Sequence, residues 1–263
     1  MTSPKCCEIL RMRIDALTMS DLNEIIRRAV PHSRTCLIAN HNLNSLRLCH
    51  KDPQMRAFYD KASYVHADGM GVVLLARILR QPLLRIHRTT YADWMSPLMS
   101  LAAANAWRVF YLGSAPGVAE QGAERLRAQF PSLVIRTADG FFNADPWSVE
   151  SRRRLASIRD FAPHILMVGM GMPRQERWIL ANLEQISNRV ILQCGAAMDY
   201  VAGAVRTPPR FAGRLGLEWA FRLASEPRRL WRRYLVEPWS LVPIVLANRR
   251  MKTSPYTEEG DLR

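Results

Sequence analysis

The chain has 263 residues, of which 48% are hydrophobic and 23% are charged, and these proportions exclude an intrinsically disordered protein. Its length suits one large α/β domain, or one such domain with an appendage. Lysine and arginine total 37 against 23 acidic residues, so the formal net charge is +14. This excess indicates an anionic partner, which is nucleic acid, an anionic membrane surface or a phosphorylated substrate.

Six short apolar runs predict strands, and the amphipathic segments between them predict helices. Strands are expected at 36–39, 63–66, 107–112, 133–136, 164–168 and 190–193, and helices at 70–80, 118–130, 149–161 and 174–183. Alternation of this kind predicts an α/β fold with a Rossmann-like, mainly parallel sheet and helices on both faces. In such a sheet, ligands bind beyond the carboxyl ends of the strands.

The loops after these strands hold most of the unusual residues. Residues 40–45 are Asn-His-Asn-Leu-Asn-Ser, 67–71 are Ala-Asp-Gly-Met-Gly, 113–117 are Gly-Ser-Ala-Pro-Gly, 169–176 are Gly-Met-Gly-Met-Pro-Arg-Gln-Glu and 195–199 are Gly-Ala-Ala-Met-Asp. Glycine is common in such turns, so a single loop is weak evidence. Five of them at one edge of one sheet predict a ligand pocket.

The loops lack two known nucleotide-binding motifs, and their absence limits which ligands the pocket is expected to bind. Arg174 stands where a dinucleotide fingerprint needs its third glycine, and no Gly-Lys-Ser/Thr follows Gly117 as in a P-loop. What remains is a glycine-rich turn that opens onto a helix, where backbone N–H groups and the helix dipole suit a diphosphate.

Asp68 has two interpretations that the sequence alone leaves open. It is either the N-cap of the following helix or a general base, since flanking glycines give a substrate hydroxyl room to approach. Asn40, Asn42 and Asn44 are likewise either turn residues or ligands for sugar hydroxyls.

We expect neither a metal ion nor another cofactor. The six histidines form no His-x-His or His-x-x-x-His pair, and the chain has no Asp-x-Asp motif. The five cysteines include no Cys-x-x-Cys pair and favour a reducing cytoplasm. A leaving diphosphate would then be stabilised by arginines and helix dipoles.

The C-terminal part of the chain is basic and aromatic. Eleven basic residues and three glutamates lie between 206 and 252, so this stretch carries +8 of the net charge. Prolines divide it into short predicted helices, on which Arg222, Arg229 and Arg232 tend towards one face. A solvated charged face is the simpler alternative, but interleaved tryptophans favour contact with an anionic membrane surface. No stretch of the chain reaches the roughly 18 apolar residues of a spanning helix.

These motifs together resemble the WecG/TagA/CpsF family of bacterial glycosyltransferases, and the resemblance runs from about residue 8 to 235. It rests on the segments Asn40-His-Asn42, Ala67-Asp68-Gly-x-Gly71, Arg88-Thr89-x-x-Asp93, Gly169-x-Gly171-x-Pro-x-Gln175-Glu176-x-Trp178, Gly195-x-x-x-Asp199, Arg206-x-Pro and Glu218-Trp219-x-x-Arg222-x-x-x-Glu226-Pro227-x-Arg229.

The resemblance implies an inverting, metal-independent transferase that moves a hexose from a UDP-sugar to a polyprenyl-diphosphate-linked sugar at the cytoplasmic face of the bacterial plasma membrane. It implies Asp68 as the base, Asn42 as a residue that holds donor and acceptor, and Arg88 and Gln175 in the pocket. The matched appendage arginines are Arg222, Arg229 and Arg232. The expected organisation is a catalytic core at 1–204, a membrane-facing appendage at 205–251 and a tail at 252–263.

The expected site therefore has two groups of residues. The catalytic group is Asp68, Asn42, Asn40 and Arg88; the substrate-binding group is Gly113, Gly169, Gly171, Gln175, Glu176, Gly195, Asp199, Arg222, Arg229 and Arg232. Family members often carry Thr where this chain has Asn40, and the variant resembles the branch that holds the xanthan-pathway glucosyltransferase. That branch implies transfer of glucose from UDP-glucose to glucosyl-diphosphate-polyprenol with a β-1,4 linkage, whereas other members imply an N-acetylmannosaminyl-type sugar.

Two other classes stay open, a basic nucleic-acid-binding module and a peripheral membrane scaffold without catalysis. The five polar loops would have no purpose in a nucleic-acid-binding module, so we expect no nucleic-acid partner. A homo-oligomer also stays open.

Overall fold

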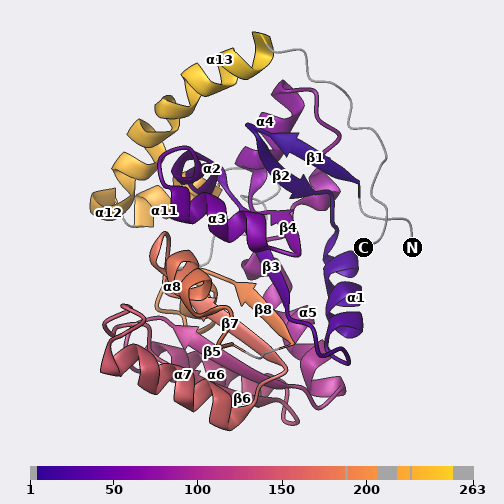
Figure 1. Cartoon of the computed structure of the whole chain (residues 1–263), viewed down its shortest axis with the longest axis vertical. Helices are drawn as coiled ribbons and strands as arrows, with labels where there is room; N and C mark the ends of the chain where they lie inside the picture. Colours follow the sequence, from indigo (N-terminus) through magenta and orange to yellow (C-terminus); the bar gives the residue numbers. More distant parts are fainter. Residues whose placement is uncertain (1–4, 187–188, 206–217, 226, 251–263) are drawn as a thin grey trace.

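In the computed structural model of the chain, the described residues are 5–186, 189–205, 218–225 and 227–250. A six-stranded parallel sheet forms the centre, with the strand order β4-β3-β8-β7-β5-β6 (Figure 1). Its strands are β3 Cys36–His41, β4 Tyr64–Ala67, β5 Arg108–Gly113, β6 Val134–Ala138, β7 Ile165–Gly169 and β8 Val190–Gln193. All six predicted strands are therefore present, and the predicted α/β class is confirmed.

Helices cover both faces of this sheet, because successive residues of each buried strand point to opposite sides. In β5, Phe110 and Leu112 join one core and Val109 and Tyr111 join the other. The first face carries α2 Leu43–Cys49, α3 Pro53–Lys61, α4 Met70–Ile78, α7 Val149–Phe161 and α8 Arg174–Asn182. The second face carries α1 Met19–Ala29, α5 Tyr91–Ala104, α6 Val118–Gln129 and α9 Ala197–Val201.

An antiparallel hairpin that the sequence analysis did not predict precedes the sheet. Its strands are β1 Cys6–Ile9 and β2 Met12–Asp15, and the buried side chains of Ile9 and Ile14 extend the first core. The carboxylate of Asp15 accepts a hydrogen bond from the Val65 N–H at 2.8 Å. The hairpin is thereby fixed to β4, the edge strand of the sheet.

The C-terminal helices form the appendage, and they pack on the core. They are α11 Glu218–Ser225, α12 Pro227–Trp231, the π-type turn η2 Arg232–Val236, the 3-10 turn η3 Glu237–Leu241 and α13 Val242–Arg250. Leu241 is 5% exposed within the first core, and the Glu237 carboxylate forms an ion pair with Arg47 of α2 at 2.8 Å. The appendage is therefore docked beside α2, as Figure 1 shows. Among the described helices, none has the length and apolar character needed to cross a membrane.

Candidate active site

The chain path creates a topological switch point at the carboxyl ends of two central strands, β5 and β7. From β5 the chain continues to β6 on one side, and from β7 it continues to β8 on the other side. The crevice outside such a switch point is where open α/β sheets bind ligands. Gly113 at the end of β5 and Gly169 at the end of β7 are paired in register there.

The floor of this crevice is made of backbone. A Cβ atom added to Gly113 would lie 2.3 Å from the Gly169 carbonyl oxygen, and one added to Gly169 would lie 2.4 Å from the Gly195 carbonyl oxygen. The structure thus brings these three glycines together. The loops after β5, β7 and β8 can touch because a glycine, which has no side chain, stands at each point of contact. Gly113 and Gly169 are buried and Gly195 is half-buried, so the three loops are held in close contact.

Gln175 fastens two of these loops to each other. Its side-chain oxygen accepts hydrogen bonds from the Gly171 N–H and the Gly195 N–H, both at 3.2 Å. The side chain is fully buried at the first turn of α8. The predicted pocket residue Gln175 therefore sets the spacing between the β7 and β8 loops, rather than facing the crevice as an open side chain.

Glu176 lies below Gln175 and is also fully buried. Its Oε1 accepts hydrogen bonds from Gln175 Nε2 at 2.9 Å and from Gln193 Nε2 at 2.7 Å. The Asn40 side-chain nitrogen in turn donates to the Gln193 carbonyl oxygen at 2.8 Å, and Asn40 is 4% exposed. The side chains of Asn40 and Glu176, which the sequence analysis assigned to substrate contact, thus form a layer beneath the loops.

Asn42 is the N-cap of α2. Its side-chain oxygen accepts hydrogen bonds from the Asn44 and Ser45 N–H groups at 3.0 and 3.1 Å, and Ser45 completes a capping box. Capping of this kind stabilises a helix by roughly 1 kcal/mol. The turn interpretation therefore accounts for the side-chain oxygen of Asn42, and this half-buried residue lies at the carboxyl end of β3.

Asp68 follows β4 at the same edge, and its N–H donates to the His41 carbonyl oxygen at 2.8 Å. The N-cap of α4 is Gly69 rather than Asp68, which removes the simpler interpretation of this carboxylate. Gly69 has φ +88°, and a Cβ there would meet no described atom within 4 Å. The half-buried Asp68 thus borders open space at a strand end.

Arg88 is brought next to Asp68 by the fold. Its backbone forms an isolated parallel bridge with Ala67, and the Thr89 N–H donates to the Ala67 carbonyl oxygen at 3.0 Å. The Arg88 guanidinium donates to the Asp93 carboxylate at 3.0 Å, and its side chain is 13% exposed. Asp93, which belongs to the same motif, therefore holds the arginine at the end of β4.

Buried aromatic and histidine side chains lie near the carboxyl ends of β3 and β4. His41 stacks on Tyr59 with ring centroids 3.8 Å apart. The pKa of His41 is lowered to about 3, mainly by burial and secondly by the electrostatic effect of His66. Burial lowers the pKa of His66 to about 4. The pKa of Tyr91 is raised by burial and then by the charges of Cys194 and Asp68. Both imidazoles are therefore neutral near pH 7. The electrostatic effect of Asp68 on Tyr91 indicates that the two side chains lie near each other.

Asp199, in the first turn of α9, lies at the β8 end of the crevice. Burial and then the charge of Asp199 raise the pKa of Cys194, so this carboxylate is close to the end of β8. Tyr111 contributes to the same corner, because its hydroxyl and that of Ser114 lie 3.0 Å apart. Asp199 therefore lies near the carboxyl end of β8, after the turn that contains Gly195.

The appendage arginines are placed only in part. Arg222 lies on α11 and Arg229 on α12, but their side chains lie outside the described residues, as do Arg206 and the rest of its motif. Arg232 is exposed, and its guanidinium carbon lies 5.9 Å from the centre of the Trp231 ring.

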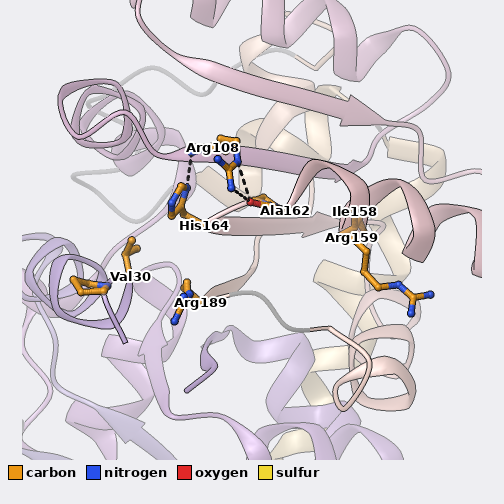
Figure 2. A pocket seen from close by; sticks show the side chains of 9 residues that line it. Val30, Arg108, Ile158, Arg159, Ala162, His164 and Arg189 are labelled. Atoms are coloured by element: carbon orange, nitrogen blue, oxygen red, sulfur yellow. Dashed lines mark hydrogen bonds between the residues drawn. The ribbon is translucent and has the colours of Figure 1, made fainter. Parts of the chain in front are cut away.

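A separate pocket of about 470 Å³ opens at the opposite end of the strands, where they begin. Figure 2 shows its Arg108, His164 and Arg189 side chains, which stand at or just before the starts of β5, β7 and β8. The Arg108 guanidinium donates to the Ala162 carbonyl oxygen, and the Arg108 N–H donates to His164 Nδ1. This pocket lies at the amino ends of the strands, away from the predicted site.

The fold is that of a doubly wound α/β protein with a switch point between β5 and β7. Comparison with known proteins then gives the family, because residues 7–255 match the model of the glycosyl transferase WecG/TagA/CpsF family. The chain belongs to this family of glycosyltransferases. It is also 28% identical over 250 residues to the N-acetylglucosaminyldiphosphoundecaprenol N-acetyl-beta-D-mannosaminyltransferases of Staphylococcus aureus strains MRSA252 and NCTC 8325 / PS 47. These alignments cover 91% of this chain and 95% of each relative.

Two contributors to the site were missed by the sequence analysis. Gln193 ends β8 and binds both Glu176 and Asn40, and the Tyr59 hydroxyl donates to the Asn40 carbonyl oxygen at 2.9 Å. The available signal was a glutamine at the end of an otherwise apolar strand. A buried strand excludes such a side chain unless its amide finds partners.

Proposed function

We propose that this glycosyltransferase moves a hexosyl unit from a UDP-sugar to a sugar carried on a polyprenyl diphosphate, with inversion and without a metal ion. The observation that carries the proposal is that Asp68 and Arg88 lie at the same carboxyl end of the parallel sheet as Gly113, Gly169 and Gly195. The family match favours transfer over the nucleic-acid-binding module and over the scaffold without catalysis.

In the proposed reaction, Asp68 accepts the proton of the acceptor hydroxyl. That oxygen attacks the anomeric carbon from the face opposite the UDP group, the new C–O bond forms, and the bond to the β-phosphate oxygen breaks. The open space beside Gly69 supports this role, because the acceptor hydroxyl needs room to reach the carboxylate.

The diphosphate that leaves carries its negative charge on oxygens. We place it over Gly113, Gly169, Gly171 and Gly195, near the N-terminus of α8, with Asp199 towards the ribose. Arg88 is rigidly held by Asp93 and can stabilise developing charge without reorganising. We assign Arg222, Arg229 and Arg232 to the leaving diphosphate and the lipid diphosphate. Gln175, Glu176 and Asn40 hold the loops in register, and Asn42 orients substrate from the end of α2.

The acceptor class is carried over from the relatives, whose printed names describe transfer of N-acetylmannosamine to a diphosphoundecaprenol-linked sugar. For the donor we propose either that sugar or glucose, as the loop at Asn40–His41–Asn42 suggests. We further propose that the protein acts at the inner face of the bacterial plasma membrane. The appendage supports this location with exposed aromatic rings, among which Trp239 is 72% exposed.

The test is a transfer assay with a short-chain polyprenyl-diphosphate-sugar acceptor, run with UDP-glucose and with UDP-N-acetylmannosamine, each with and without EDTA. We expect turnover with one donor, unchanged by EDTA. Asp68→Asn should lower kcat about 100-fold to 10,000-fold while UDP still binds. Asp60→Asn is the matched control, because Asp60 is an exposed carboxylate on α3. Near-normal turnover of Asp68→Asn would remove Asp68 as the base, and a strict metal requirement would overturn the metal-free reaction.

A further inference from the structure

The segment between Asp68 and Arg88 carries an exposed apolar surface. Leu74 and Ile78 on α4 are each 50% exposed, and Leu84 and Ile86, in and just before the 3-10 turn η1 Arg85–His87, are 62% and 67% exposed. Single exposed apolar residues are normal on a soluble protein, but here four lie within thirteen positions. We call these four residues and the arginines between them the α4–η1 patch.

The charged side chains of the patch are all basic. Arg77, Arg80 and Arg85 are exposed within it, and residues 69–92 contain no aspartate or glutamate. Leucine and isoleucine interleaved with arginine, without acidic residues, is the composition of an interfacial surface. The apolar side chains enter the acyl boundary of a bilayer, and the guanidinium groups remain at the level of the lipid phosphates.

The position of the patch ties it to the proposed reaction. Asp68 lies two residues before α4 and Arg88 directly follows η1, and the Thr89 N–H bond to the Ala67 oxygen closes the segment at the end of β4. The patch thus lies on a segment whose two ends hold Asp68 and Arg88. Figure 1 places α4 at the same end of the molecule as α13, away from β6 and α7.

We propose that the α4–η1 patch is a second membrane contact, formed by the core itself, that seats the Asp68 edge on an anionic bilayer. The proposal rests on the proposed function, since a lipid-linked acceptor presents its diphosphate at headgroup level. A second copy of the chain fits less well. A symmetric interface would place the arginines of one copy against those of the other, without an acidic partner in the segment.

The experiment is sedimentation of the full chain with vesicles of phosphatidylcholine alone and of phosphatidylcholine with phosphatidylglycerol. Leu84→Ser/Ile86→Ser should lower partitioning onto the anionic vesicles by about tenfold or more, because two apolar side chains no longer leave water. Arg77→Gln/Arg85→Gln should lower it by about fivefold for each arginine and weaken the preference for phosphatidylglycerol. All substituted positions are exposed, so thermal midpoints should match the parent protein.

The matched control is Val134→Ser/Val149→Ser, two residues that are 43% and 56% exposed on β6 and α7. It should leave partitioning unchanged. Transfer to a short-chain acceptor in solution should be equal for the parent and for Leu84→Ser/Ile86→Ser, whereas transfer to a long-chain acceptor in vesicles should fall in the variant.

Unchanged partitioning of Leu84→Ser/Ile86→Ser would overturn the proposal. So would a dimer that dissociates in this variant while vesicle binding persists, since the patch would then join two copies. Loss of short-chain transfer with intact folding would also overturn it, by making the patch part of the substrate pocket. Partitioning needs no sugar substrate, so the membrane result stands even if the proposed transfer fails.

Discussion

The buried carboxylate of Glu176 makes a prediction that separates a positioning role from direct substrate contact. Its Oε1 receives the amide N–H groups of Gln175 and Gln193 at 2.9 and 2.7 Å, and all three side chains are fully buried. Glu176→Ala leaves two buried donors without an acceptor, each at a cost of about 1–3 kcal/mol. Together with the cavity, the loss of unfolding free energy should be about 3–6 kcal/mol.

Glu176→Gln is the variant that should still fold. It keeps the shape and one acceptor oxygen but removes the charge, and a neutral hydrogen bond is weaker than a charge-assisted one by about 1 kcal/mol. Two bonds predict a loss of about 2 kcal/mol, measured by urea unfolding. Gln175 would then be less firmly fixed, and its hydrogen bonds from the Gly171 and Gly195 N–H groups should weaken. Calorimetry should therefore show UDP binding weakened about fivefold.

The control is Glu184→Gln, because Glu184 is exposed just after α8 and should change neither quantity. A buried charge also carries a desolvation penalty, which the hydrogen bonds must exceed. If Glu176→Gln is as stable as the parent protein and binds UDP equally well, the reasoning fails. If UDP binding is lost altogether while stability is kept, Glu176 contacts the nucleotide and does not act through Gln175.

Two further predictions concern the floor of the crevice and the buried imidazoles. Gly169→Ala would place a Cβ 2.2 Å from the Tyr111 hydroxyl and 2.4 Å from the Gly195 oxygen, so unfolding free energy should fall by about 1–3 kcal/mol and UDP affinity should fall with it. Gly117→Ala, where φ is +81° but a Cβ meets no described atom within 4 Å, should cost only about 1 kcal/mol of strain and leave UDP binding intact; equal effects of the two variants would refute the close-contact argument. The pKa of His41 lies at about 3 and that of His66 at about 4 in the folded protein, against 6.5 ordinarily, so the unfolded chain takes up protons first as the pH falls below 6.5. Each histidine should therefore cost about 2 kcal/mol of stability at pH 5, roughly 4 kcal/mol for the pair, and a difference under about 1 kcal/mol between urea unfolding at pH 7 and at pH 5 would contradict this.

The sheet was predictable because its strands are buried on both faces and appear as continuous apolar runs. The hairpin β1–β2 was not, since its strands have four residues each and the connection through Leu10 and Arg11 uses positive φ without glycine or asparagine. The helical nature of the appendage was indicated by its prolines, one of which, Pro227, begins α12. Its docking through Leu241 and the Arg47–Glu237 ion pair depends on contacts that no local pattern reports.

The grouping of the polar loops at the carboxyl end of the sheet was predictable from the sequence. Strand ends converge at one edge by topology, so Asp68, Asn42 and Gly195 could be grouped without coordinates. Whether a side chain points up into the crevice or down into the sheet depends on register, and a motif does not carry that information. Asn40 and Glu176 therefore looked equivalent to their neighbours, although Gln193 and Gln175 hold them beneath the surface. The role of Asp68 as a helix cap could be decided only by the backbone at Gly69.

The contact of three glycine backbones beneath the crevice has a consequence for how the protein can evolve. A Cβ at Gly113 or Gly169 would lie within 2.5 Å of a neighbouring carbonyl oxygen, because of their close approach to Gly169 and Gly195, respectively. The floor is therefore closed to gradual change by substitution. Under the proposed function, changes in donor or acceptor preference should arise in side chains outside these glycines.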